Sequence, residues 1–143
     1  MGKKEGSKKE RIVLATGKRK TAVARARVKP GLGRVTINDV PLDLWQPEYV
    51  RIKIREPLLL ANEFSQKVDI KVNVRSGGIS SQADAIRQAI ARGIVEFFND
   101  EKLKKIYLDH DRNLLVYDSR MTEPHKPSRS RKGARRHKQR SKR

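Results

Sequence analysis

The chain has 143 residues, the length of one ordinary domain, and 35 Lys and Arg against 16 Asp and Glu give it a net charge of +19. It contains no cysteine, which excludes disulfides, a thiol nucleophile and a Cys-ligated zinc site. No apolar run approaches the ~18–20 residues that span a bilayer, and residues 1–10 lack the apolar stretch of a secretory signal. We therefore expect an intracellular protein that attracts polyanions and has no membrane contact.

The positive charge lies at both ends of the chain. Residues 1–34 carry 12 Lys/Arg and 2 Glu (+10), residues 35–119 carry 12 Lys/Arg and 13 Asp/Glu (−1), and residues 120–143 carry 11 Lys/Arg and 1 Glu (+10). The sequence thus predicts a basic flexible extension over residues 1–10, a globular domain over 11–118 and a basic extended tail over 119–143. The tail has too few apolar residues to offset the entropy of ordering it.

The first elements are expected to be strands. One begins at residues 12–14 and reaches a basic turn at residues 17–20. Residues 22–29 then alternate with a period of two, which is typical of a strand with one buried face. The small buried face, which would let a helix pack closely, consists of Ala22, Ala24, Ala26 and Val28. On the other face Arg25, Arg27 and Lys29 follow one another at ~6.5–7 Å, close to the spacing of phosphates along a nucleic-acid strand.

Strands and helices follow in mixed order. Residues 34–39 and the alternating residues 68–75 predict two more strands. Pro47 is suited to begin a helix, which Pro57 is expected to kink or restart. An apolar stripe predicts a helix over residues 83–97, and residues 99–100 can cap a short helix with Leu103, Ile106 and Tyr107. Residues 114–116 predict a last strand or extended segment. This order favours an α+β fold with helices against one sheet.

A glycine-rich turn precedes the longest predicted helix. Its residues are Gly77, Gly78, Ile79, Ser80, Ser81 and Gln82. Free backbone N–H groups and the helix dipole would favour a phosphate there, although Ser80 or Ser81 could instead cap the helix. The turn is not a P-loop, because no Gly-Lys-Ser/Thr ends it.

A catalytic centre has little support. Asp109, His110 and Asp111 form the only cluster that resembles a metal or acid–base site, but adjacent residues do not converge from one face, so we interpret them as a polar turn. We predict no catalytic residues, no metal site and no cofactor.

Nucleic acid is the partner that the composition favours. No aromatic residue follows Tyr117, so the tail offers no stacking platform and is expected to contact phosphates. The absence of a sequence-reading motif indicates a protein that recognises the shape of a large folded RNA. Two alternatives stay open at this point: a DNA-compacting architectural protein, and an enzyme that acts on RNA.

Three stretches resemble a known family. They are GKRKTAVARAR at 17–27, GGISSQADAIRQAIAR at 77–92, and an ending that runs from GARR at 133–136 to SKR at 141–143. In this order they resemble ribosomal protein nine of the small subunit, and most of all its archaeal and eukaryotic branch. The similarity covers nearly the whole chain from about residue 12.

The resemblance implies a fold, partners and a site. The fold is a mixed four- to five-stranded sheet with helices on one side and a left-handed βαβ crossover. The implied partners are ribosomal RNA in the head of the small subunit, neighbouring ribosomal proteins and peptidyl-site transfer RNA. The implied location of the protein is the ribosome in the cytoplasm. Lys142 and Arg143 would reach transfer RNA. The residues expected to bind ribosomal RNA are Lys18, Arg19, Lys20, Arg25, Arg27, Gly77, Gly78, Ser80, Ser81, Gln82, Arg129, Arg131, Lys132, Arg135, Arg136, Lys138 and Arg140.

Overall fold

The computed structural model describes residues 11–45, 47–129 and 131–134. The expected N-terminal extension and residues 135–143 lie outside the described residues, and with them the predicted contacts of Arg135, Arg136, Lys138, Arg140, Lys142 and Arg143.

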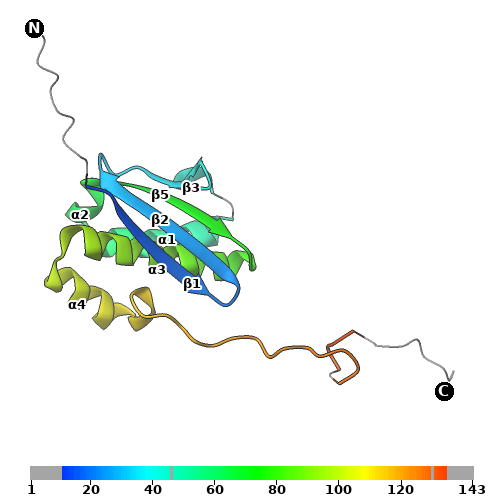
Figure 1. Ribbon diagram of the computed structural model, residues 1–143. Coiled ribbons are helices and arrows are strands. Elements are labelled where there is room, and N and C mark those ends of the chain that lie inside the picture. Colours follow the sequence, from blue (N-terminus) through cyan, green and yellow to red (C-terminus); the bar gives the residue numbers. More distant parts are fainter. Residues whose placement is uncertain (1–10, 46, 130, 135–143) are drawn as a thin grey trace, which may run out of the picture.

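The sheet has five strands in the order β1-β2-β5-β3-β4 (Figure 1). The strands are β1 (Val13–Arg19), β2 (Ala22–Pro30), β3 (Val35–Ile37), β4 (Val40–Pro41) and β5 (Val68–Arg75). Neighbouring strands run antiparallel, except for β3 and β5, which are parallel. The connection from β3 to β5 holds β4, η1 (Leu42–Leu44), α1 (Glu48–Ala61) and α2 (Glu63–Gln66). The predicted mixed sheet of an α+β fold is therefore confirmed.

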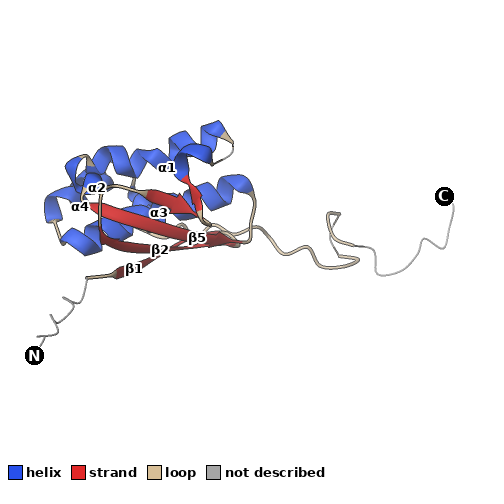
Figure 2. Ribbon diagram, turned by 90° about the horizontal axis from the view of Figure 1, so that it is seen from above, coloured by secondary structure: helices blue, strands red, loops and turns tan. Residues whose placement is uncertain are grey.

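The helices cover one face of the sheet (Figure 2). The long helix α3 (Ile79–Phe98) packs on β1, β2 and β5, and α1 lies beside it. Further along the chain, α4 (Glu101–His110) and η2 (Arg112–Leu114) pack against α1 and α3. The predicted small face of β2 is buried under α3, and the predicted stripe of α3 supplies Ala83, Ile86, Ile90 and Ile94 to the core. No helix of the described residues lies over the opposite face of the sheet.

Small residues allow α3 to lie directly on β1 and β2. A Cβ atom added to Gly17 would lie 2.0 Å from the carbonyl oxygen of Ala85, and one added to Gly93 would lie 2.7 Å from Cγ2 of Val28. Two side chains of α3 also bond the outer edge of β1. Gln88, only 3% exposed, accepts a hydrogen bond from the Lys18 amide at 2.8 Å, and Arg92 donates to the Thr16 carbonyl at 3.0 Å. These bonds cover the backbone of an edge strand.

One expectation about local structure was wrong, and one of the two outcomes expected at Pro57, a restart of the helix, is excluded. Pro57 does not restart the helix, because α1 continues to Ala61 with the Pro57 ring buried and its carbonyl accepting a hydrogen bond from the buried Tyr107 hydroxyl at 2.7 Å. Burial of the ring and the bond from Tyr107 hold a residue that would otherwise end the helix. Residues 114–116 form no strand: Leu114 ends η2 with its side chain in the core, and Asp111 caps this turn. By contrast, the predicted cap at Asp100 is confirmed, since its side chain accepts from the Lys102 amide at 2.8 Å.

None of the helices in the described ranges is long and apolar enough to cross a membrane.

Replacement of Gly17 by alanine tests the close approach of α3. The new Cβ would meet backbone, so the helix or the strand has to move, and we expect Gly17→Ala to lower the free energy of unfolding by about 2–3 kcal/mol. Gly78→Ala is the matched control, because its Cβ meets nothing within 4 Å, and it should change stability by less than about 1 kcal/mol. Equal stability of the two variants in urea denaturation would contradict this packing.

Asp69 gives the fold a predictable dependence on pH. Its carboxylate accepts hydrogen bonds from the amides of Arg34 and Leu32, at 3.0 and 2.9 Å, and these bonds lower its pKa. A pKa below the unfolded value of about 3.9 adds stability above that pH, which is lost as the pH falls through the folded pKa. We expect Asp69→Asn to cost under about 1 kcal/mol at pH 7, because both hydrogen bonds to this carboxylate are exposed to solvent.

The measurement is the free energy of unfolding of wild type and Asp69→Asn from pH 7 down to acid. The difference between them should shrink as the pH falls below about 4. Asp109→Asn removes an exposed carboxylate that has no hydrogen bond or ion pair among the described residues, and serves as the control. A difference that stays constant down to acid pH would rule out the role given to the Asp69 carboxylate.

Candidate nucleic-acid interface

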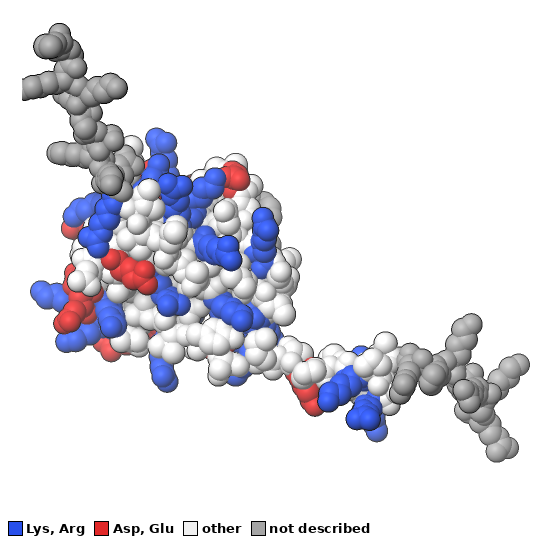
Figure 3. All heavy atoms as spheres, viewed as in Figure 1, with Lys and Arg blue, Asp and Glu red and all other residues white. Residues whose placement is uncertain are grey.

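The uncovered face of the sheet is basic. Arg25, Arg27 and Lys29 of β2 are exposed on it, and so are Lys71 and Arg75 of β5. Arg27 lies opposite Lys71 in the register, and Arg75 lies opposite Val23. In Figure 3, Lys and Arg side chains predominate over Asp and Glu on the face that it shows. We call the surface formed by Arg25, Arg27, Lys29, Lys71 and Arg75 the open face of the sheet. The alternation of residues 68–75 already placed Lys71 and Arg75 on a polar face, but only the pairing of β5 with β2 joins them to Arg25 and Arg27.

Acidic residues do little to neutralise this face. Asp69 has its carboxylate engaged by the turn before β3, and Asp39 forms an ion pair with Lys71 at 2.5 Å. Both partners of that pair are more than half exposed, so it contributes little. A hollow of about 240 Å³ lies between the two strands and is lined by Val23, Arg25, Asn73 and Arg75. The face is thus a shallow cationic surface.

The two basic or glycine-rich turns predicted from the sequence meet at one end of the sheet. A Cβ atom on Gly77 would lie 2.8 Å from Cβ of Ala22, so the turn before α3 packs against the start of β2. Lys20 and Gly77 both have positive φ, of 52° and 72°. Residues 18–20 and 77–82 are therefore brought together, which no local pattern could establish.

The start of α3 keeps its backbone donors available. Gly78 is the N-cap and has no side-chain cap, so the alternative that Ser80 or Ser81 caps the helix is wrong. The first bond within the helix runs from the Gln82 amide to the Gly78 carbonyl at 2.9 Å, and the Gln82 side chain donates to the Ser76 carbonyl at 3.1 Å. The amides of residues 79–81 have no acceptor within the helix, and no acidic side chain lies in the first turn.

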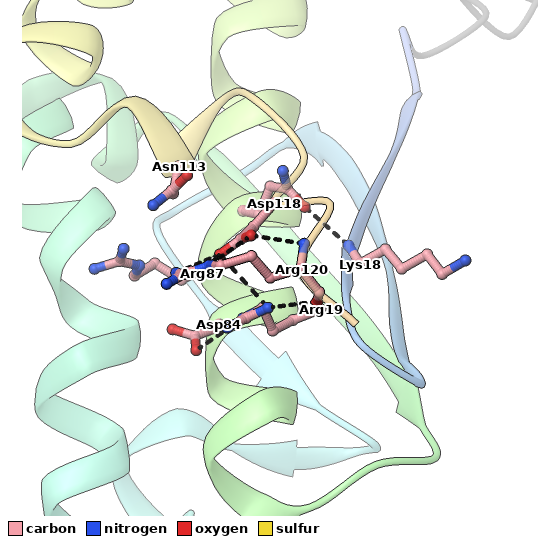
Figure 4. A pocket seen from close by; sticks show the side chains of 8 residues that line it. Lys18, Arg19, Asp84, Arg87, Asn113, Asp118 and Arg120 are labelled. Carbon is pink, nitrogen blue, oxygen red and sulfur yellow. Dashed lines mark hydrogen bonds and ion pairs between the residues drawn. The ribbon is translucent and has the colours of Figure 1, made fainter. Parts of the chain in front are cut away.

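The side chain of Arg19 lies between two carboxylates (Figure 4). It is only 17% exposed and forms ion pairs with Asp118 at 3.5 Å and Asp84 at 4.0 Å. It also donates to the Arg120 carbonyl at 3.1 Å. Nearby, the Lys18 ammonium lies 5.8 Å from the centre of the Tyr117 ring. A hollow of about 160 Å³ at this point is lined by Lys18, Arg19, Asp84, Arg87, Gln88, Asn113, Asp118 and Arg120.

Two members of the cluster at residues 109–111, His110 and Asp111, belong to a network of ion pairs within the described part of the chain, whereas Asp109 does not. His110 Nε2 lies 2.5 Å from Glu56, and Arg87 contacts both Glu56 and Asp111. These contacts join α1, α3 and the end of α4. Among the residues that the structure describes, no group of His, Asp and Glu is arranged to hold a metal ion.

The described part of the C-terminal segment runs away from the domain (Figure 1). Arg129, Arg131 and Lys132 are exposed there, within a turn in which the Ser128 amide donates to the Ala134 carbonyl at 3.0 Å.

The fold and its charge define a small basic α+β protein with one open cationic face. The family described as ribosomal protein S9/S16 matches residues 17–143, and the chain belongs to this family. Members of this family are ribosomal proteins, a structural class without enzymatic activity. The alternative of an enzyme that acts on RNA is therefore excluded.

The curated relatives are archaeal and extend over most of the chain. The chain is 53% identical to a protein of Desulfurococcus amylolyticus over 84% of its own length and 86% of that protein. It is 48% identical to one of Methanococcus maripaludis, over 92% and 98% of the two chains, and 55% identical to one of Pyrobaculum aerophilum, over 82% of each. All three are named small ribosomal subunit protein uS9. The resemblance found in the sequence, including its branch, is confirmed.

Proposed function

We propose that this protein is a structural constituent of the small ribosomal subunit in the cytoplasm, where it binds ribosomal RNA of the head and packs beside neighbouring ribosomal proteins. The observation that carries this proposal is the open cationic face of the sheet. The names of the relatives support the same assignment. The fold of this family further leads us to infer that the crossover from β3 through α1 to β5 is left-handed.

The open face is suited to the RNA backbone rather than to bases. Arg25 and Arg27 lie two residues apart on β2, so their side chains leave the same face at ~6.5–7 Å, which matches successive phosphates. Strands β1, β2 and β5 contain no aromatic residue, so the face has no platform on which a base could stack. Contacts of this kind position a protein on folded RNA by its shape.

The turns at the end of the sheet extend this interface. Lys18 and Lys20 bring cations from one turn, while the backbone of Gly77, Gly78, Ser80 and Ser81 and the adjoining Gln82 present donors from the other. Because α3 has twenty residues and no acidic residue in its first turn, its dipole favours an anion at this end. One phosphate held by these amides would fix the end of the domain on the RNA.

The tail completes the proposal. Arg129, Arg131 and Lys132, followed by Arg135, Arg136, Lys138 and Arg140, would bind ribosomal RNA, and Lys142 and Arg143 would reach transfer RNA in the peptidyl site. Each tail residue that becomes ordered costs roughly 1–2 kcal/mol of backbone entropy, so only a large preformed RNA surface can offset the cost. At a salt slope of about −0.7 per phosphate, five to eight contacts by the tail give a steep dependence on salt.

The double variant Arg25→Ala/Arg27→Ala tests the open face. Loss of two phosphate contacts should reduce the slope of log K against log salt by about 1.4 to 1.8 for refolded small-subunit ribosomal RNA. Lys104→Ala/Lys105→Ala removes the same charge from exposed positions on α4, on the helical side, and should leave the slope unchanged. Equal loss in both variants would mean that net charge alone drives binding.

Removal of Lys142 and Arg143 tests the contact with transfer RNA. Small subunits that carry the shortened chain should assemble normally and bind peptidyl-site transfer RNA more weakly, because two cations near its phosphates are gone. The measurement is transfer RNA affinity by filter binding on reconstituted subunits. Unchanged affinity in fully assembled subunits would count against this contact.

A further inference from the structure

Asp118 begins the C-terminal segment and is fixed to the end of β1. Its backbone forms a parallel bridge with Arg19, although 99 residues separate the two in the sequence. Its carboxylate, 13% exposed, pairs with the guanidinium of Arg19 at 3.5 Å. The chain therefore leaves the domain from a defined point on the strand edge and not from the end of α4.

Arg19 holds this point from two sides. Its guanidinium donates to the Arg120 carbonyl at 3.1 Å and lies 4.0 Å from Asp84 of α3, which in turn pairs with Lys53 of α1 at 2.6 Å. Three elements of the domain are thereby connected to the first residues of the tail. Figure 4 shows the Arg19 side chain between Asp84 and Asp118.

Arg120 closes the turn that follows. Its backbone amide donates to Asp118 at 3.0 Å, and its guanidinium holds both carboxylate oxygens of the same residue, at distances from 2.7 to 3.1 Å. These bonds, chiefly those from the Arg120 side chain, lower the pKa of Asp118 below its usual range. One residue earlier, the Tyr117 ring lies under the Lys18 ammonium, and its hydroxyl contacts Met121 at 3.7 Å.

We propose that Arg19, Asp84, Asp118 and Arg120 form a tail clamp, which sets the direction in which the C-terminal segment leaves the domain. Arg19 is then a positioning residue and not a phosphate ligand, in contrast to the exposed Arg25 and Arg27. Its guanidinium lies between two carboxylates, its side chain is mostly buried, and it donates a hydrogen bond to the first residues of the tail. The consequence for transfer RNA binding rests on the proposed function of the tail.

Two variants distinguish the clamp from a simple effect of net charge, because Arg19 and Asp118 carry opposite charges. Arg19→Ala lowers the net charge by one, and Asp118→Asn raises it by one, yet both break the same ion pair. Under the clamp both variants release the tail, whereas general attraction to RNA would weaken with the first and strengthen with the second. Lys105→Ala and Asp109→Asn are controls with the same charge changes on α4.

The direct measurement is the distance between two nitroxide spin labels in the free full-length protein. The chain has no cysteine, so Glu63→Cys on α2 and Thr122→Cys just after the clamp can be labelled alone. The unsubstituted clamp should give one narrow distance distribution. Arg19→Ala and Asp118→Asn should each give a broad distribution, while the unfolding midpoint of the domain stays unchanged. Arg19→Lys should give a distribution of intermediate width. The two controls should stay narrow. A broad distribution with the intact clamp, or a narrow one in both clamp variants, would overturn the proposal.

A second measurement, on reconstituted small subunits, separates the clamp from the proposed role of the tail. Both clamp variants should weaken peptidyl-site transfer RNA binding about fivefold, equal to ~1 kcal/mol, while the α4 controls do not. One outcome is a broad distance distribution in both clamp variants, together with normal transfer RNA binding by the chain that lacks Lys142 and Arg143. It would support the clamp and refute the contact of the tail with transfer RNA. Narrow distances in the clamp variants, together with weak binding after that removal, would refute the clamp alone.

Discussion

The close approach of α3 to β1 and β2 is the constraint on which the rest of the structure depends. Gly17 and Gly93 leave no room for a side chain, and the alanines of β2 and α3 keep the two layers at short distance. Because α3 packs on this face, the charged residues Arg25, Arg27 and Lys29 of β2 lie on the other face. The same contact places Gln88 and Arg92 along the edge of β1, and sets the start of α3 beside the first turn. Packing by small residues thus produces the cationic face.

The sheet and the helical layer differ in how their charged side chains are paired. The sheet presents its cations to one side with few acids among them. On the helical side, Glu56 of α1, Asp84 of α3 and Asp111, which follows α4, pair with Lys53, Arg87 and His110. Much of the unpaired positive charge of this protein, whose net charge is +19, thus lies on the open face of the sheet and in the two basic ends of the sequence. Single exposed pairs contribute little to stability. The consequence of this charge distribution is orientation, because a polyanion is attracted more strongly to the sheet face than to the helical face.

The sequence predicted the local elements far better than the contacts between them. Alternation at residues 22–29 and 68–75 and the stripe of α3 depend on burial alone, so they predicted which faces are inside. Arg19 and Arg25 were both expected to bind RNA, Arg19 as part of the basic turn and Arg25 on the polar face of a strand. Only the return of residue 118 to β1 separates them, and a contact across 99 residues leaves no local signal. The continuation of α1 past Pro57 left no local signal for the same reason, since the hydrogen bond to the Pro57 carbonyl comes from Tyr107 on another helix.

The central claim is that the open face of the sheet, together with the tail, lies against ribosomal RNA in the small subunit. Ultraviolet crosslinking of small subunits washed in high salt, followed by mass spectrometry of the RNA-bound peptides, tests it most directly. The account predicts crosslinked nucleotides on peptides of β2, β5 and the tail, with α1 and α4 free of them. Crosslinks confined to α1 and α4, or loss of the protein in the salt wash, would contradict it.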